Sequence, residues 1–490
     1  MDTSEMTKSY YRLTDDTALR SWQFVPQAFY KRSEVDAKPL SDEEFDLMML
    51  CDGEHEIPYS RLADSPTGQG LIEPCKKGEK PSEWSAYKKY PHRYFPEMVL
   101  MMTGRCNYNC IHCFNAKDNE PLMSEWSWDE LRDLLDQASD AGVHAFTITG
   151  GEPMYHEHFM DMMRYIYKKN MVVKELNTNG HFLTRELLEE LKSFGCDPLI
   201  KISFDGVGYH DKIRNFTGAE KTTIEKMRLV VDSGFRLMSQ TQTNRINVDS
   251  MMDTARLLDD IGVVRMRFTR TNEVPRWTRL VGDASLHPME YCERMIAFAG
   301  EYAKSGMQTE LSIWNLINLD PKRKCYRLVP VMFREGQYRP TQAVCMDCRR
   351  MINVRSNGDL LTCLQIGGGL DEMGDRFENL HEKKLSEVLM DSRWQKLVCT
   401  NVHRISEVTE QCAVCKYFKY CGGGCRAVAM LISDTRADYI KTHGSAHGLP
   451  FDEKFYLSPD KTKCAFFHGG WYERAVEAMD DWENQSEISV

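Results

Sequence analysis

Apolar runs of strand length alternate with amphipathic stretches of helix length from about residue 96 to about residue 270. The six expected strands are Met98–Met102, Ala145–Thr149, Val172–Leu176, Leu199–Phe204, Leu237–Thr243 and Val264–Phe268. The five expected helices are Trp128–Ala141, Glu157–Lys169, Thr184–Phe194, Ala219–Ser233 and Ser250–Ile261. Strands separated by helices run parallel, and right-handed crossovers curl such a series into a barrel or partial barrel. The pattern therefore predicts an α/β fold, a partial (β/α)6 barrel, with its chemistry at the carboxyl ends of the strands.

The segments on either side of this barrel follow other patterns. Leu19–Tyr30 predicts one or two strands, and Ser41 with Glu44 predicts a capped helix over Asp42–Cys51. Strands with a short helix predict a small α+β domain, winged-helix-like in form. After about residue 330 the periodicity fades and glycine and cysteine take over. The expected parts are therefore an N-terminal domain at 1–95, the barrel at 96–325, a cysteine-rich domain at 326–475 and an acidic tail at 476–490.

Composition excludes several kinds of partner. The chain has 62 basic and 73 acidic side chains, a net charge of −11, and it has no basic tract, so nucleic acid is not expected as a partner. No apolar run reaches the roughly 18 to 20 residues that span a bilayer. The first residues contain no apolar signal segment, so we expect a cytoplasmic protein without a membrane partner.

The 17 cysteines are too many for an average cytosolic enzyme and too dilute for a disulfide scaffold, which favours metal ligation. Eleven of them form two groups. The first group is Cys106, Cys110 and Cys113, and the second is Cys345, Cys348, Cys363, Cys412, Cys415, Cys421, Cys425 and Cys464. The single cysteines Cys51, Cys75, Cys196, Cys292, Cys325 and Cys399 are expected to be mainly small buried hydrophobic residues.

The first group follows the first barrel strand and places three cysteines within eight residues of one loop. A structural zinc or iron–sulfur site takes four protein ligands, so a site with three leaves one coordination position for another molecule. A zinc knuckle that borrows a distant ligand, or accidental spacing, is the alternative interpretation.

Further motifs follow the next three strands. They are Gly150-Gly151-Glu152-Pro153, Leu176-Asn177-Thr178-Asn179-Gly180, and Ser203-Phe204-Asp205-Gly206 with His210, Asp211 and Arg214 behind it. Together with the CxxxCxΦC triplet, in which His112 takes the aromatic place, they resemble the radical S-adenosylmethionine (SAM) superfamily. Each fragment alone is weak, since Ser203 or Asp205 could simply cap a loop. Their common order at four strand ends is specific.

The resemblance implies a cofactor and a reaction. The three cysteines of the loop would hold a [4Fe–4S] cluster that binds SAM at its open iron, and one electron would release a 5′-deoxyadenosyl radical that abstracts hydrogen. The resemblance also implies an electron donor such as flavodoxin or ferredoxin. It implies cofactor contacts from Gly150, Gly151, Glu152, Asn179, Ser203, Asp205 and Arg214.

The second group has the spacing Cys348-x9-Gly358-x4-Cys363, then Cys412-x2-Cys415-x5-Cys421-x3-Cys425, then Cys464. A zinc ribbon is the alternative, but 63 residues separate Cys348 from Cys412, far more than a ribbon has. The spacing resembles the SPASM extension of peptide-modifying radical enzymes, which carries two auxiliary [4Fe–4S] clusters. The resemblance implies that one cluster is held by Cys345, Cys348, Cys363 and Cys425, and the other by Cys412, Cys415, Cys421 and Cys464.

Two details depart from the relatives. Cys345 lies unusually close to Cys348, so Cys325 is an alternative ligand, and with that ligand the first auxiliary cluster would keep an open iron. Leu364 stands where sulfatase-maturing relatives have an aspartate, which argues against formylglycine formation.

The N-terminal domain bears on the substrate. It resembles the precursor-peptide recognition element of ribosomal peptide maturases, which binds a leader peptide as an added strand. A barrel cap or a dimerisation element is the alternative. The preferred function is a peptide maturase that makes a thioether or carbon–carbon crosslink or a related change. The other hypotheses are a radical enzyme acting on a non-peptide such as a tetrapyrrole, and a non-catalytic iron–sulfur electron carrier. No motif identifies a catalytic acid or base.

Overall fold

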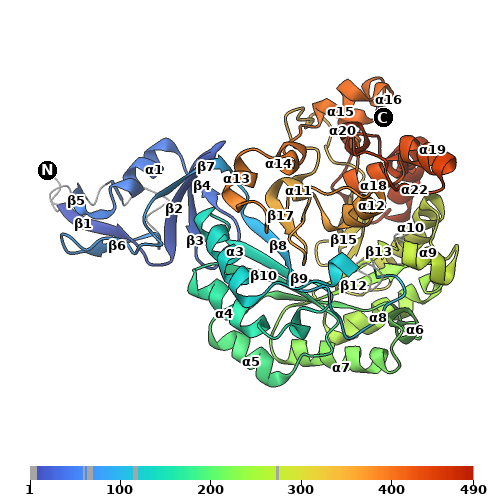
Figure 1. Cartoon of the computed structure of the whole chain (residues 1–490), viewed down its shortest axis with the longest axis horizontal. Coiled ribbons are helices and arrows are strands. Elements are labelled where there is room, and N and C mark those ends of the chain that lie inside the picture. Colours follow the sequence, from blue (N-terminus) through green and yellow to red (C-terminus); the bar gives the residue numbers. More distant parts are fainter. Residues whose placement is uncertain (1–7, 59–60, 63–69, 114–119, 272–274, 489–490) are drawn as a thin grey trace.

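The structure is a computed structural model that describes residues 8–58, 61–62, 70–113, 120–271 and 275–488. An N-terminal module projects from a strand-and-helix barrel, and a mainly helical C-terminal region covers another side of that barrel (Figure 1). The first seven residues, on which the absence of an export signal was predicted, lie outside the described part. Among the described residues no helix is long and apolar enough to cross a membrane.

The N-terminal module contains two small sheets. Its elements are β1 (Lys8–Leu13), β2 (Thr17–Gln23), β3 (Val25–Lys31), β4 (Lys38–Pro39), α1 (Asp42–Met49), β5 (Asp52–Pro58), β6 (Ile72–Cys75) and β7 (Lys88–Arg93). The strand orders are β5-β1-β6 and β4-β3-β2-β7. The predicted capping box of α1 is formed, because the Ser41 hydroxyl accepts from the Glu44 N–H and the Glu44 carboxylate accepts from the Ser41 N–H. The α+β character predicted for this part is confirmed.

The barrel has the predicted alternation. Its parallel strands are β8 (Glu97–Met101), β9 (Ala145–Thr149), β10 (Val172–Thr178), β11 (Leu199–Ser203), β12 (Leu237–Thr243), β13 (Arg265–Arg270) and β14 (Glu310–Ile313). Its helices are α3 (Trp128–Asp140), α4 (Phe159–Lys168), α5 (Arg185–Ser193), α6 (His210–Arg214), α7 (Ala219–Asp232), α8 (Met251–Ile261), α9 (Pro275–Val281) and α10 (Pro288–Lys304). All six predicted strands and five predicted helices are present, so the α/β barrel prediction is confirmed.

The sheet continues beyond the predicted strands in both directions. The strands that follow β14 are β15 (Ile317–Asp320), β16 (Cys325–Leu328) and β19 (Glu483–Asn484). On the other side β17 (Met351–Val354) pairs in parallel with β8, and β18 (Leu360–Leu361) pairs with β17. The segment predicted as an acidic tail therefore supplies part of α22 and then β19, which lies beside β16.

Short helices dominate the C-terminal region. They are α11 (Met346–Arg350), α12 (Gly367–Met373), α13 (Leu385–Met390), α14 (Arg393–Val398), α15 (His403–Val408), α16 (Glu410–Ala413), α17 (Phe418–Cys421), α18 (Arg426–Leu431), α19 (Asp434–His443), α20 (Glu453–Tyr456), α21 (Lys461–His468) and α22 (Trp471–Ala478). One large core of buried side chains runs from the barrel into this region. The two parts therefore pack as one body.

The N-terminal module contacts the barrel at the amino-terminal end of its strands. His144 directly precedes β9, and its ring stacks on Tyr30 with 4.4 Å between the ring centroids. Its Nε2 lies 3.2 Å from the Arg32 carbonyl oxygen. The module is thus at the opposite end of the barrel strands from the motifs predicted to carry the chemistry.

Candidate functional site

The loop after β8 carries Cys106, Cys110 and Cys113 at the carboxyl end of the strand. Polar groups from this loop and from the end of β10 contact Cys106 Sγ. The Tyr108 N–H lies 3.4 Å from Cys106 Sγ, and Asn179 Nδ2 lies 3.7 Å from it. Burial raises the pKa of the Cys106 thiol to about 11. A buried thiol of this kind ionises only when a metal or a nearby cation compensates its charge.

The two glycines after β9 are required by the packing of this loop. The Gly151 N–H donates to the Thr103 carbonyl oxygen at 2.6 Å. A methyl group on Gly151 would lie 2.2 Å from the Arg105 carbonyl oxygen, and one on Gly150 would lie 2.6 Å from that of Thr103. Side chains larger than hydrogen would therefore push the two loops apart. In this structure the glycines permit a close approach to the cysteine loop, and their contact with the cofactor stays a prediction.

Glu152 joins the second and third strand ends. Its buried carboxylate accepts from Thr178 Oγ1 and from the Asn179 N–H, each at 2.8 Å, and from the Met154 N–H at 3.3 Å. Burial raises the pKa of Glu152 to about 7 despite these hydrogen bonds. Asn179, held in this way, reaches the cysteine loop by donating from Nδ2 to Asn107 Oδ1 at 2.8 Å. Glu152 thus orients the polar end of β10 toward the cysteine loop.

A buried ion pair supports the loop from the fourth strand end. Asp205 Oδ2 lies 2.7 Å from Arg214 Nε and 3.5 Å from His112 Nε2, and Asp205 Oδ1 accepts from the Gln242 N–H at 2.9 Å. Arg214 Nη1 in turn lies 3.7 Å from Cys110 Sγ. Burial alone would lower the pKa of Arg214, but Asp205 and the cysteine thiols raise it, so the guanidinium stays charged. It supplies positive charge where ligating thiolates would need it. Ser203, by contrast, ends β11 half-buried and takes no part in this ion pair.

One contributor to the loop carried no sequence signal. Arg276, on α9, donates from Nε to the Cys110 carbonyl oxygen at 3.2 Å and from Nη2 to Asn109 Oδ1 at 2.7 Å. It lies beyond the last predicted strand in a segment without a motif. Only the folded chain brings it beside the loop.

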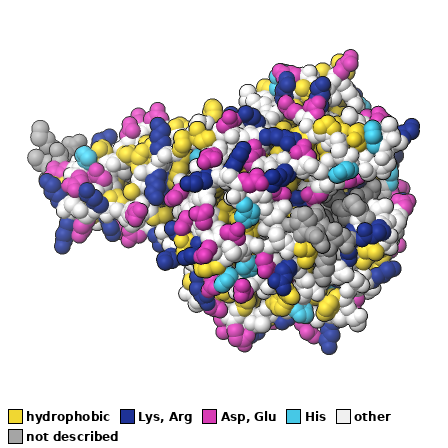
Figure 2. All heavy atoms as spheres, viewed as in Figure 1, with side chains coloured by type: hydrophobic (Ala, Val, Ile, Leu, Met, Phe, Trp, Pro, Cys, Tyr) yellow, Lys and Arg dark blue, Asp and Glu magenta, His cyan; other side chains and the backbone are white. Residues whose placement is uncertain are grey.

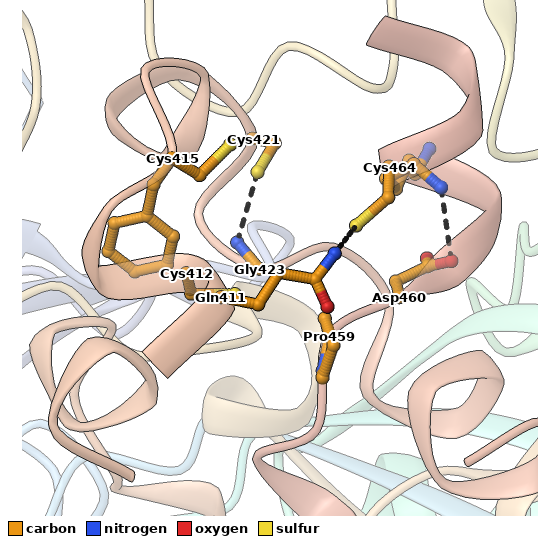
Figure 3. A pocket seen from close by; sticks show the side chains of 10 residues that line it. Gln411, Cys412, Cys415, Cys421, Gly423, Pro459, Asp460 and Cys464 are labelled. Carbon is orange, nitrogen blue, oxygen red and sulfur yellow. Dashed lines mark hydrogen bonds between the residues drawn. The ribbon is translucent and has the colours of Figure 1, made fainter. Parts of the chain in front are cut away.

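The C-terminal region brings four predicted cysteines together around one cavity. Cys412, Cys415, Cys421 and Cys464 line a small hollow with Gly423 and Asp460 (Figure 3). They come from α16, the loop after it, α17 and α21. The Gly423 N–H lies 3.4 Å from Cys421 Sγ, and His468 Nε2 lies 3.6 Å from Cys415 Sγ.

The other four predicted cysteines form a second gathering. The Cys348 N–H donates to Cys345 Sγ at 3.5 Å, and the thiols of Cys345 and Cys363 both raise the pKa of the Cys348 thiol. Cys425, at the start of α18, is close enough to Cys345 and Cys363 for their charges to act on it, and burial raises its pKa to about 12. Cys325 is elsewhere, on β16, with Asp320 and Glu483 as neighbours. Of the two alternatives raised by the sequence, Cys345 is therefore the one beside Cys348.

Two buried cations lie among these eight cysteines. Arg426 donates to four carbonyl oxygens, those of Gly423, Gly424, Tyr456 and Ser458. Lys463 donates to the Asn315 carbonyl oxygen at 2.6 Å, and the neighbours that act on its charge are Asp460, Cys425, Cys292 and Cys421. Because Cys421 and Cys425 belong to different gatherings, Lys463 lies between the two.

These features test whether iron–sulfur clusters fit. The Tyr456 hydroxyl and Thr362 Oγ1 are buried without a hydrogen-bond partner among the described residues, and both lie by the cysteines around Cys348. Clusters with four thiolates are anionic, so they would balance Arg426 and Lys463 and could accept from such orphaned hydroxyls. The residues present therefore fit these groups. Within the described ranges no three His, Cys, Asp or Glu side chains are placed to hold one single metal ion.

Comparison with known proteins identifies the fold and part of the chemistry. Residues 100–258 match the model of the radical SAM superfamily. The AdoMet-dependent heme synthase of Methanosarcina barkeri is 25% identical over 350 residues, which cover 69% of this chain and 93% of that protein. The antilisterial bacteriocin subtilosin biosynthesis protein AlbA of Bacillus subtilis is 25% identical over 326 residues, covering 66% and 65%.

A solved structure extends the likeness. SuiB of Streptococcus suis, bound to the precursor peptide SuiA, has a TM-score of 0.59 at 14% identity and covers 86% of this chain and 97% of SuiB. The chain contains a radical SAM domain and is a radical SAM enzyme, for which a [4Fe–4S] cluster and SAM are the expected cofactors. The predicted resemblance to radical SAM enzymes and peptide maturases is confirmed.

Proposed function

We propose that this enzyme is a peptide maturase that abstracts hydrogen from a residue of a ribosomally made precursor peptide and forms a thioether, a carbon–carbon crosslink or a related modification. We further propose that the C-terminal cysteines hold two auxiliary [4Fe–4S] clusters, one for each gathering of four. When bound, the loop cluster and SAM supply the electron and the 5′-deoxyadenosyl radical for this chemistry.

The chain's own residues hold and orient these groups. The three loop cysteines would bind the SAM-binding cluster, and Arg214 compensates the charge of their thiolates. Glu152 holds Thr178 and Asn179 in place beside that loop.

The N-terminal module is the observation that carries the peptide assignment. The fold match to SuiB covers 86% of this chain, which is more residues than the barrel and the C-terminal region contain together. The match therefore extends into the N-terminal module. The module also has open sheet edges among the described residues. β5 is a seven-residue edge strand, and β4 pairs with only two of the seven residues of β3. A peptide can add to such an edge as a further strand.

A direct experiment uses the full reconstituted chain and candidate precursor peptides encoded beside its gene. With SAM and a reductant, we expect 5′-deoxyadenosine and a peptide lighter by two hydrogen atoms. Hydrogen–deuterium exchange should show protection of β3 or β5 by the peptide and none by a scrambled peptide. If 5′-deoxyadenosine forms while no encoded peptide changes mass or protects the module, the peptide assignment is wrong.

A tetrapyrrole substrate is the second candidate, because the relatives include an AdoMet-dependent heme synthase. It would account for the barrel and the C-terminal region but assigns no role to the sheet edges of the N-terminal module. Co-purification or tight binding of a porphyrin chromophore, with a porphyrin product, would favour it over the peptide assignment.

A further inference from the structure

An open cavity lies on the barrel sheet where β13 to β16 meet. Its walls carry four arginines, Arg265, Arg267, Arg323 and Arg327, against the two acidic side chains Glu310 and Asp320. This local excess of positive charge contrasts with the net charge of −11 of the whole chain. The cavity belongs to none of the cysteine sites described above.

Strand register places a polar row along this cavity. Arg267 pairs with Ser312, Ser312 with Asn318, and Asn318 with Arg327, on four successive strands. Residues directly opposite one another in a sheet point to the same face. The neighbours that alternate with them along the strands, such as Leu311, belong to the large core on the other face. The row therefore presents two guanidinium groups and two small polar side chains to one surface.

Arg267 and Arg327 differ from the other two arginines. Arg265 pairs with Glu310 at 2.5 Å and Arg323 with Asp320 at 3.6 Å. Neither Arg267 nor Arg327 has an ion pair with another described residue. Arg267 Nε is buried without a hydrogen-bond partner, and its guanidinium lies 5.3 Å from the centre of the Trp314 ring.

The surroundings of Arg267 connect the cavity with the interior of the barrel. Arg267 pairs in register with Gln240 of β12, and it acts electrostatically on Glu175, which is engaged by Lys201 at 2.5 Å. Asp347, on α11 between Cys345 and Cys348, also acts on the charge of Arg267. The polar row therefore starts inside the barrel, near the first C-terminal cysteine gathering, and ends at the exposed Arg327.

We propose that the row from Arg267 to Arg327 is a substrate subsite that binds a carboxylate. The planar fork of a guanidinium matches a carboxylate in two parallel hydrogen bonds, and Ser312 and Asn318 can donate to the same oxygens. Apart from Arg323 and Gln485, the walls come from strands of the sheet, and no glycine loop or helix start lines the cavity, so the features that cradle phosphates are missing from its lining. The carboxylate belongs to an acidic residue of a peptide or to a small molecule such as a tetrapyrrole. The role of this subsite in catalysis rests on the proposed function, whereas its binding of a carboxylate does not.

The test measures binding of defined probes to the full reconstituted chain by calorimetry, without SAM or reductant. One pair of probes is the capped tripeptide Ac-Ala-Glu-Ala-NH2 and its glutamine counterpart, and the other pair is coproporphyrin III and its tetramethyl ester. We expect an acid to bind at least about tenfold more tightly than its uncharged counterpart, and Arg267→Gln to abolish that difference. Preference for the acidic peptide identifies a peptide carboxylate, and preference for the free porphyrin identifies a small-molecule carboxylate.

Two further variants keep the result interpretable. Arg256→Gln, on the outer face of α8 where Arg256 pairs with Asp253, is the matched control and should keep the preference. Arg267→Lys should keep part of it. Thermal unfolding should show Arg267→Gln to be as stable as the parent or more stable, because the lost group is a buried charge that forms no ion pair with another described residue.

The subsite is refuted if neither acid is preferred over its uncharged counterpart, or if Arg256→Gln weakens binding as much as Arg267→Gln. Either result leaves the proposed function standing, since 5′-deoxyadenosine formation and peptide modification are measured separately. Conversely, if the parent enzyme shows no radical chemistry, the proposed function is wrong, and the measured preference for a carboxylate still stands.

Discussion

The loop cysteines and the C-terminal cysteines reach their arrangement by different routes. Cys106, Cys110 and Cys113 come from one segment of eight residues, and their environment is completed by the ends of the next three strands. The eight C-terminal cysteines come from segments spread between residues 345 and 464. Each of their two gatherings draws on parts of the chain that lie far apart in sequence, as Cys363 and Cys425 do.

The supporting charges differ in the same way. At the loop, the cation Arg214 is paired with the buried Asp205, so that its position is set before any cluster binds. In the C-terminal region Arg426 donates to carbonyl oxygens and has no carboxylate partner among the described residues, and Lys463 lies between two groups of cysteines. The barrel therefore holds the loop site in shape by itself, whereas the C-terminal region would depend on the two proposed clusters for charge balance. The following predictions test that contrast.

The largest effect is expected from replacing Cys106, Cys110 and Cys113 together with alanine. SAM cleavage should be abolished, while iron analysis should fall from about 12 to about 8 atoms per chain, because only one of three clusters is lost. The half-buried Cys75, in the N-terminal module, provides a control, and Cys75→Ser should leave both quantities unchanged. A drop to near zero iron would show that the C-terminal clusters depend on the loop site.

The next effect concerns Cys464, which links α21 to the other three cysteines of the cavity. Cys464→Ser should remove about four iron atoms and make the C-terminal region sensitive to proteolysis, because cluster binding and folding are coupled there. Slow 5′-deoxyadenosine formation should persist, since the barrel site is intact, while substrate modification is lost. Unchanged protease resistance would mean that packing alone maintains this region.

The third prediction concerns Glu152 and the stability of the barrel. Because burial raises its pKa to about 7 from an ordinary value of 4.5, the folded chain keeps this proton to higher pH than the unfolded chain. The stabilisation is complete below about pH 4.5 and is lost as the pH rises through about 7. Glu152→Gln should remove up to about 3 kcal/mol of this pH-dependent change in unfolding free energy.

Urea unfolding of the parent and the variant between about pH 5 and pH 8 measures the difference. The exposed Glu225, replaced by glutamine, is the control and should follow the parent. If the Glu152→Gln curve has the same pH dependence as the parent, the carboxylate is ionised throughout and its three hydrogen bonds outweigh burial.

The smallest effect is expected at Lys463. Lys463→Met removes a buried positive charge beside both C-terminal gatherings, so the midpoint potentials of the auxiliary clusters should fall by on the order of 50 mV. An EPR-monitored redox titration measures the shift. Lys461→Met, on the same helix but exposed and paired with Asp434, is the matched control and should shift them far less. Equal shifts in both variants would contradict the placement of Lys463 between the clusters.

Much of the barrel could be predicted because its information is local. Period and capping depend on neighbouring residues, so Ala145–Thr149 and Leu237–Thr243 were predicted with the bounds that the structure has. α6 was not predicted, because a helix of five residues has too few turns to show a period. Neither was the parallel pairing of β17 with β8, which joins segments about 250 residues apart.

The candidate sites also have parts that the sequence predicted and parts that it did not. The cysteine spacing predicted three ligands in the loop, and through its resemblance to the SPASM extension it predicted eight in the C-terminal region, since spacing along the chain is a property of the sequence. Spacing could not decide between Cys325 and Cys345, and it carried no signal for Arg276, Tyr456 or the row that starts at Arg267. These side chains act across strands and loops that only folding brings together.

The sequence by itself therefore determined the α/β barrel, the cysteine loop and the radical SAM class, because periods and short motifs are written in consecutive residues. The tertiary structure alone decided which cysteine stands beside Cys348, which cations are buried among the thiols, and which arginines of the cavity at β13 to β16 form no ion pair with another described residue. The physical reason is that burial and charge pairing depend on distances in space, and residues far apart in the chain acquire those distances only when it folds.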